Sequence, residues 1–289
     1  MPNNDIAGWA CAKPTYKVTP LRDERGVVGA HYLDDLQKHG LDFDTLIRDD
    51  AIFAEIIDME LIAESIADAS LSSLADLAVN ERVRRAYLIW LGFMNVDLKP
   101  WTTGGAIHFR PHWARTLLLA LTLGDAYKLN DVDLRCLATA AVFHDSRRKN
   151  PYLDTGHGKR AAEYYKEFCQ QRPCAHTTTV GKVMCFDPRC YLTIRWHDRD
   201  DELGIKAIEE AFGENTIPEL DISDVQSLMP KGAKAEGSLI YRLFKDVDGL
   251  DRVRLGKNEP DISFLRTEKA LEMLPYAHEL LDASSQIVP

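Results

Sequence analysis

The chain has 289 residues, of which 45% are hydrophobic and 28% charged, a composition typical of a globular protein with a sizeable core. Its net charge of −10 argues against an extended nucleic-acid surface, and no apolar run approaches the roughly 20 residues of a membrane helix. The first residues lack the pattern of a secretion signal, so we expect a cytoplasmic protein whose six cysteines are thiols or metal ligands.

Hydrophobic spacing predicts helices along most of the chain beyond residue 30. Gly40 suits the end of one such segment, and Asn80 suits the N-cap of another. Strand signals are weak, because only 190–196 alternates and its pattern fits a helix equally well. The expected fold class is therefore all-α. Helices are predicted over 31–40, 41–77, 80–93, 112–129, 130–145, 157–171, 207–214, 237–256 and 264–286.

Two stretches interrupt the helical pattern. Residues 97–111 are rich in proline and glycine, and residues 172–190 contain cysteine and proline, so both are expected to form loops. We expect an N-terminal extension and helical segment, 1–95, packed on a second unit, 96–289. The leucine-rich helices of the first unit suit a core, a lid over a site or the surface of a homo-oligomer, and their spacing does not decide among these.

Histidine and aspartate side chains lie at the ends of predicted apolar helices or within them. His112 begins one helix, His144 and Asp145 end the next, and Asp248 lies in a later one. A buried imidazole or carboxylate is costly unless it is paired or bound to a metal. Several such side chains near one another would favour a bound metal ion.

The order of these residues resembles the HD-domain superfamily of metal-dependent phosphohydrolases. The resemblance covers about residues 104–270 and includes the segments IHFRPHWART, AAVFHDSRR, DTGHGKRAAEYY and FKDVDGLDRVRLG. The last motif of the family commonly reads Asp-Ala-Asp-Arg-Leu-Asp, so Asp248 matches its metal-binding aspartate. The resemblance implies that His112, His144, Asp145 and Asp248 bind one divalent ion, and two imidazoles with two carboxylates suit Mn, Fe, Zn, Ni or Mg. Gly249 stands where the family has arginine, and Arg252 is a candidate to replace it. The resemblance implies an HD-domain helical bundle with additional N-terminal helices.

The resemblance also implies a reaction and a second metal ion. His157 and His197 match the histidines that hold a second ion in two-metal members, with Asp145 bridging the two ions. The implied function is hydrolysis of a phosphate ester or anhydride, of a nucleotide or another small phosphorylated metabolite, with Asp145 as the base or as the group that orients water. Two alternatives stay open: an HD-type di-iron oxygenase with the same six ligands, and a non-catalytic nucleotide-binding module.

Basic residues near these ligands point to an anionic phosphorylated substrate. Arginine presents forked donors that suit phosphate. Arg115, Arg148 and Lys159 are predicted to contact the substrate, although a basic run such as 147–149 also suits a solvated helix end.

The remaining polar residues receive less specific predictions. Asp246 and Asp251 are expected either at the surface or behind a ligand histidine, and Asp198 at the surface. His108 suits a loop and the mouth of a pocket equally. The cysteines at 169–190 form two pairs, each with four residues between its members, which offers a structural zinc site. Zinc sites usually have tighter spacing, so free thiols are expected.

Overall fold

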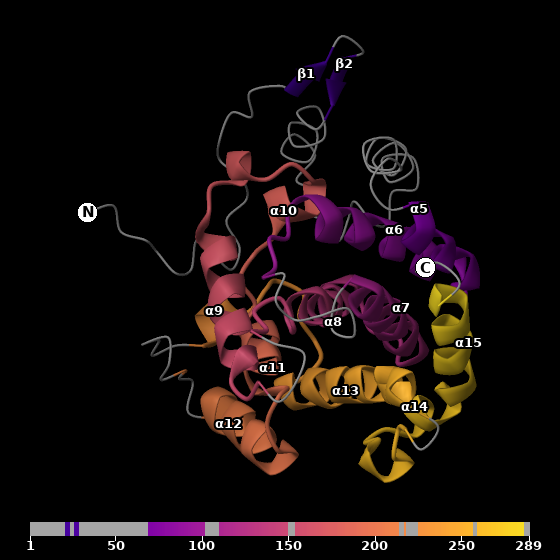
Figure 1. Ribbon diagram of the computed structural model, residues 1–289. Coiled ribbons are helices and arrows are strands. Elements are labelled where there is room, and N and C mark those ends of the chain that lie inside the picture. The colour runs from indigo at the N-terminus through magenta and orange to yellow at the C-terminus, as the bar shows by residue number, and fades with distance from the viewer. Residues whose placement is uncertain are drawn as a thin grey trace.

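The computed structural model describes residues 21–23, 26–28, 69–101, 110–149, 154–213, 217, 225–256 and 259–285. Helices dominate this part of the chain, which confirms the all-α class (Figure 1). A short antiparallel hairpin pairs β1 (Leu21–Asp23) with β2 (Gly26–Val28). The α-helices are α5 (Ala69–Ser72), α6 (Glu81–Val96), α7 (Arg110–Ala126), α8 (Asp131–Phe143), α9 (His157–Gln170), α10 (Thr179–Val183), α11 (Pro188–Trp196), α12 (Asp201–Gly213), α13 (Gly237–Leu250), α14 (Glu268–Glu272) and α15 (Leu274–Ser285). The 3₁₀ helices are η1 (Ser73–Leu77), η4 (Pro173–Ala175), η6 (Gln226–Leu228), η7 (Asp251–Leu255) and η8 (Ile262–Phe264).

Helices α7 and α8 form the centre of the helical body. Every residue from His112 to Gly124 on α7 is buried, as is most of α8. A helix that is apolar on nearly all sides requires neighbours all around it. Helices α6, α13 and α15 pack against α7, while α11 packs against α8, α9 and α13. Figure 1 shows α7 and α8 between α6 and α13.

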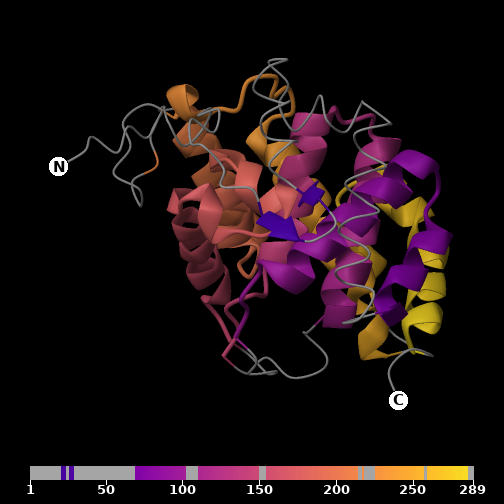
Figure 2. The same cartoon turned by 90° about the horizontal axis from the view of Figure 1, so that it is seen from above.

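The two ends of the described helical body lie side by side. The C-terminal helix α15 contacts η1, and Figure 2 shows this last helix beside the helices that begin the body. One hydrophobic core runs from Leu74 and Trp90 through Leu117 to Leu280. Residues 69–96 therefore share a core with the rest of the body. Most of the predicted unit 1–95 falls outside the described residues, and the division into two units stays a prediction.

Polar caps begin several of these helices. The Asn80 side chain accepts a hydrogen bond from the Val83 amide at 2.9 Å, which confirms the predicted N-cap of α6. Asn130 caps α8 in the same way through the Asp133 amide.

The prediction of a loop over 172–190 is wrong, because this stretch contains η4, α10 and the start of α11. Asp187 accepts from the Arg189 amide, and Pro188 takes the first helical position, where proline is favoured. The prolines interpreted as loop markers thus begin helices. Residues 190–196, which fitted a strand or a helix, are helical.

Candidate metal centre

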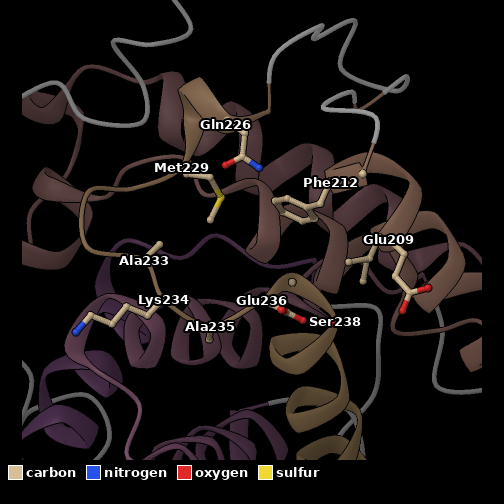
Figure 3. A pocket seen from close by; sticks show the side chains of 12 residues that line it. Glu209, Phe212, Gln226, Met229, Ala233, Lys234, Ala235, Glu236 and Ser238 are labelled. Atoms are coloured by element: carbon tan, nitrogen blue, oxygen red, sulfur yellow. The ribbon is translucent and has the colours of Figure 1, made fainter.

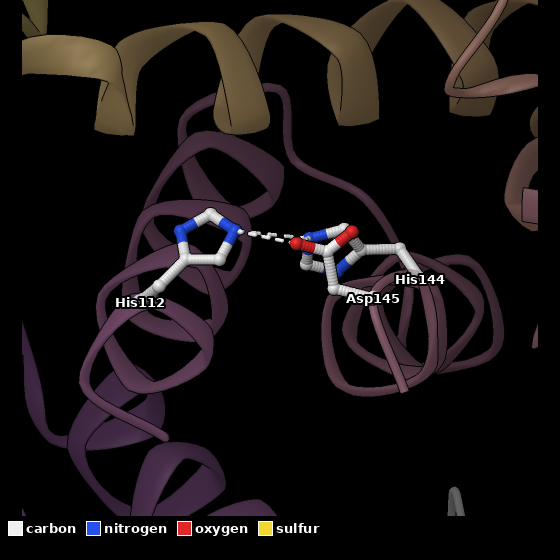
Figure 4. Close-up of side chains that lie close together, drawn as sticks. All are labelled: His112, His144 and Asp145. Atoms are coloured by element: carbon white, nitrogen blue, oxygen red, sulfur yellow. Dashed lines mark hydrogen bonds and ion pairs between the residues drawn. The ribbon is translucent and has the colours of Figure 1, made fainter. Parts of the chain in front are cut away.

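Three packed helices bring the first group of ligand-type residues together. His112 lies in the first turn of α7, His144 and Asp145 follow the last residue of α8, and Asp248 lies near the end of α13. The Nε2 atom of His112 is 3.1 Å from Nε2 of His144 and 3.6 Å from Oδ2 of Asp145 (Figure 4). Oδ1 of Asp248 is 3.6 Å from the His112 Nε2 and 3.9 Å from the His144 Nε2. We call these four residues the first set.

The other oxygen of Asp145 faces a second group. His157 is the first residue of α9, and His197 follows the last residue of α11. Nε2 of His157 is 2.9 Å from Oδ1 of Asp145 and 2.9 Å from Nε2 of His197, whose own distance to Oδ1 is 3.8 Å. We call Asp145, His157 and His197 the second set. Asp145 therefore belongs to both sets, with one carboxylate oxygen directed at each.

All four histidines direct the same ring atom at these sets. In each ring Nδ1 lies 2.7–2.9 Å from an oxygen that only accepts hydrogen bonds, which places the ring proton on Nδ1 and leaves a lone pair on Nε2. The acceptors are Oδ2 of Asp251 for His112 and the carbonyls of Ala141, Asp154 and Ile194 for His144, His157 and His197. Within each pair the two Nε2 atoms therefore face each other, and a cation between them would contact both.

The distances fit a bound metal ion. Two imidazole nitrogens that bind one ion at roughly 2.0–2.1 Å lie about 2.8–3.4 Å apart when their bonds meet at right-angle to tetrahedral geometry. The two Nε2 separations are 3.1 and 2.9 Å. The buried side chains of His112, His144 and Asp145, and those of Asp145, His157 and His197, could each hold an ion.

Burial and neighbouring groups keep the first set in the protonation states that bind a cation. Burial lowers the pKa of His144 to about 3 and also lowers the pKa of His112, so both rings are neutral at pH 7. Burial opposes the charge of Asp248, but the surrounding imidazoles, His144 first, lower its pKa below the usual range. Neutral imidazoles and an ionised carboxylate are the protonation states in which these groups bind metal.

The second set differs from the first in the direction in which the pKa of a histidine is shifted. Burial acts to lower the pKa of His197, but its hydrogen bond to Asp145 and the charge of that carboxylate raise the pKa overall. Asp145 therefore favours a positive charge beside this ring, and a metal ion there would supply one.

A buried carboxylate supports His112 from behind. Asp251 accepts from the ring of His112 and is held in turn by Arg115, whose Nε lies 2.6 Å from Oδ1. Arg115 also donates to Ser284. Asp246 has a different place, because it accepts from the Arg266 amide and the Thr267 hydroxyl. Of the two aspartates predicted at the surface or behind a ligand histidine, Asp251 stands behind one and Asp246 secures a turn.

Four of the six ligand-type residues line a cavity of about 370 Å³, namely Asp145, His157, His197 and Asp248. Nη1 of Arg148 lies 3.3 Å from both Asp145 Oδ1 and His157 Nε2, so this arginine is directed at the second set. Arg115 is buried against Asp251 and Lys159 is exposed, and neither lines the cavity. The cations on the cavity wall are Arg148, Arg199, Lys245, Arg252 and Arg254.

Two of these cations, Lys245 and Arg199, were not singled out from the sequence. Lys245 precedes Asp248 by three positions on α13, a spacing that puts both on one helix face. Arg199 follows His197 by two residues. Proximity to predicted ligands along the chain was a signal for both residues.

Asp198 contradicts its prediction as a surface charge. Its side chain is 4% exposed, accepts from the Gly156 amide and lies 3.5 Å from Nδ1 of His157. Burial acts to raise its pKa, but the charges of His197 and His157 and hydrogen bonds from backbone amides lower it overall. An aspartate beside a ligand-type histidine thus supports the start of α9. His108 lies outside the described residues.

The described cysteines are free thiols. None of them belongs to either group of described residues that could hold a metal ion. Burial raises the pKa of the Cys190 thiol well above its usual value, and Cys136 lies beside it. Neutral thiols in an apolar core are the expected state of buried cysteines.

A separate cavity of about 430 Å³ lies where α12 ends and α13 begins (Figure 3). Phe212 and Met229 line it together with Glu209 and Lys234, and it shares no lining residue with the cavity of the ligand sets. No histidine lines this cavity. Both groups of described residues that could hold a metal ion include Asp145.

Comparisons of the chain with protein-family models, curated proteins and solved structures find no match. Among the described helices, none combines the length and apolar character required to cross a membrane. The functional assignment therefore depends on the geometry of the two sets and on the order of their residues.

Proposed function

We propose that this chain is a metal-dependent phosphohydrolase of the HD-domain type, which cleaves an ester or anhydride of a small phosphorylated molecule. The observation that carries the proposal is the position of Asp145, whose two carboxylate oxygens face two separate histidine pairs. An aspartate in this position is able to bridge two ions, as in the two-metal members of the family that the residue order resembles.

The proposal gives each part of the centre a role. The first set would hold one ion and the second set another, with Asp145 shared between them. Divalent ions there would supply Lewis acidity toward a phosphoryl oxygen and toward the attacking water. Asp145 faces both sets and would orient that water. Asp251 keeps the His112 ring in the tautomer that presents Nε2 to the centre.

The cations on the cavity wall support a phosphorylated substrate. Phosphoryl transfer spreads negative charge over the phosphoryl oxygens, and guanidinium groups stabilise such charge with paired donors. Arg148 is directed at the second set, and Arg199 lines the same cavity. These side chains would hold the phosphate group against the ligand sets.

The position of Arg148 favours hydrolysis over oxidation. A di-iron oxygenase would use the same six ligands, but oxidation of a small organic molecule has no general need for an arginine directed at those ligands. A non-catalytic nucleotide-binding module would use the cations and would have no need for two ligand sets that share an aspartate.

Elemental analysis of the purified protein and a screen for phosphate release test the proposal. We expect two divalent ions per chain and phosphate release from nucleotides or sugar phosphates under anaerobic conditions. Two irons per chain with dioxygen consumption and no phosphate release would establish the oxygenase instead. Stoichiometric nucleotide binding without turnover, across several divalent metals, would establish the binding module.

The variant Asp145→Asn tests the shared ligand directly. Loss of this charge removes an anionic ligand from both sets, so we expect a loss of metal content with little change in helical circular dichroism. Phosphate release should fall by more than the roughly 10- to 100-fold that loss of an outer partner of a ligand costs. Asp200→Asn is the matched control, because Asp200 is an exposed aspartate of the same cavity. Unchanged metal content in Asp145→Asn would refute the ligand assignment.

A further inference from the structure

A second cavity adjoins the cavity of the ligand sets. Its volume is about 400 Å³, within the usual range for small-molecule sites. Lys245, Asp248 and Arg252 line both cavities, so the two meet beside the first set. We call the second cavity the side pocket. A molecule with its phosphate at the ligand sets is able to extend past Asp248 into it.

An exposed aromatic ring forms part of the side-pocket wall. Phe264 belongs to η8 and is 68% exposed, the highest value among the large hydrophobic residues of the described chain. Asp261 accepts from the Ser263 amide at 3.0 Å and from its hydroxyl at 2.7 Å, which secures the turn that carries Phe264. Exposed phenyl rings offer a flat face on which planar rings stack.

A glycine on α13 leaves space next to Asp248. Gly249 lines the side pocket, and a Cβ atom added there would meet Leu265 Cδ2 at 3.6 Å, an ordinary van der Waals contact. Packing therefore does not require glycine at this position. Glycine inside a helix costs about 0.5–1 kcal/mol relative to alanine. Gly249 therefore leaves this part of the side-pocket wall without a side chain, next to the metal-type ligand Asp248.

Charged groups border the side pocket without filling it. Arg252 pairs with Glu259, with 2.9 Å between Nε and Oε2, and Arg266 is held by Asp201 and Asp246. These cations are therefore balanced by carboxylates. Arg148, the arginine suited to the phosphate group, lines the cavity of the ligand sets and not the side pocket. The exposed flat surface in the side pocket is the ring of Phe264.

We propose that the side pocket binds a planar aromatic ring carried by the phosphorylated substrate, with Phe264 as the stacking surface and Gly249 as the residue that admits the ring. This proposal rests on the proposed function for the position of the phosphate. A nucleobase and a simple phenyl ring would both stack on Phe264. Substrates that carry one or the other ring distinguish these two possibilities.

Substrate pairs that differ in the ring test the side pocket. Adenosine 5′-phosphate and phenyl phosphate carry a ring, and ribose 5-phosphate carries none. In Phe264→Ala and Gly249→Leu, the kcat/KM ratio of a ring-bearing to the ring-free substrate should fall at least about fivefold, in line with the loss of one stacked ring. A fall for adenosine 5′-phosphate alone identifies a nucleobase, and a fall for both identifies a general aromatic site. Ile262→Ala is the matched control, since Ile262 is 54% exposed on the same turn but does not line the side pocket.

A binding measurement separates this proposal from the proposed function. Adenosine has no phosphate, so saturation-transfer NMR detects its binding whether or not the protein releases phosphate. We expect binding to the wild type and to Ile262→Ala, and a weaker signal with Phe264→Ala and Gly249→Leu. Phosphate release without the ratio change, or adenosine binding that is absent or equal in all four proteins, overturns the side-pocket proposal. Adenosine binding of the expected pattern without turnover of any phosphate ester overturns the hydrolase proposal and leaves the side pocket standing.

Discussion

Two buried polar clusters in this protein differ in how their charges are balanced. In the arginine cluster, Arg189 donates to Asp187 through Nε and Nη2 and to Asp133 through Nη1. Asp133 also accepts from the amides of Lys234 and Ala235. In the two ligand sets, by contrast, the Nε2 atoms of paired histidines face each other at 3.1 and 2.9 Å. Donors and acceptors match in the first cluster, and acceptors predominate in the second.

The contrast shows why burial alone does not mark a functional site. A buried ion pair with all its donors satisfied is complete without a ligand. Burial acts to lower the pKa of Arg189, but the charges and hydrogen bonds of Asp187 and Asp133 raise it far above its usual value, so it stays charged. Neutral imidazoles and carboxylates gathered in one place offer ligands to a cation from outside. The imbalance, more than the burial of the residues, points to a metal.

The largest effect on stability is expected from the arginine cluster. Arg189→Met leaves Asp187 and Asp133 buried without their cation, so the free energy of unfolding should fall by about 3–5 kcal/mol in chemical denaturation. Metal content per folded chain should stay the same, because the cluster contacts neither set. Arg242→Met, an exposed arginine on α13, is the control and should change stability by less than about 0.5 kcal/mol. A loss of metal in folded Arg189→Met would break the distinction between the two clusters.

Metal removal should produce the next largest effect. Free ion at 100 times its dissociation constant stabilises a folded protein by about 2.7 kcal/mol relative to the chelated form. We expect such a gain for the wild type, because the ligand sets exist only in the folded chain. Thermal unfolding with and without chelator measures it. In Asp145→Asn the gain should disappear, and equal gains in both proteins would mean that the ion binds elsewhere.

A smaller effect is expected from pH in the metal-free protein. The pKa of His144 is about 3 in the folded chain, below the value of 6.5 for the unfolded chain. Between these values the unfolded state binds more protons, so stability falls as the pH falls from 6.5 toward 3. By pH 5 this group should have cost on the order of 2 kcal/mol.

The variant His144→Gln isolates that pH effect. Glutamine does not titrate, so the loss of unfolding free energy between pH 7 and pH 5, measured in chelator, should be smaller in the variant than in the wild type by this amount. Equal losses in the two proteins would show that the His144 ring is not held neutral by burial.

Part of the candidate site was accessible from residue order. The residue order predicts that His112, His144, Asp145 and Asp248 converge, and the structure brings them together. Three of the four Nδ1 contacts are local, since Ala141, Asp154 and Ile194 each precede their histidine by three residues. Their occurrence depends on the way a helix begins or ends at that point, which spacing did not reveal.

Other features depended on distant contacts. Arg115 was expected to meet the substrate, yet it holds Asp251, which lies 136 residues away along the chain. Nothing near Arg115 in the chain identifies this partner, because the partner is set by the packing of α7 against α13 and α15.

The amino-acid sequence by itself determined the helical class and the residue types able to bind a divalent ion. Both follow from local properties, namely the spacing of apolar residues and the chemistry of imidazole and carboxylate groups. The tertiary structure alone decided that Asp145 divides its oxygens between two histidine pairs and that Arg148, rather than Arg115 or Lys159, is directed at them. The orientation of a side chain at a helix end depends on which helices pack against it, and those helices come from distant parts of the chain.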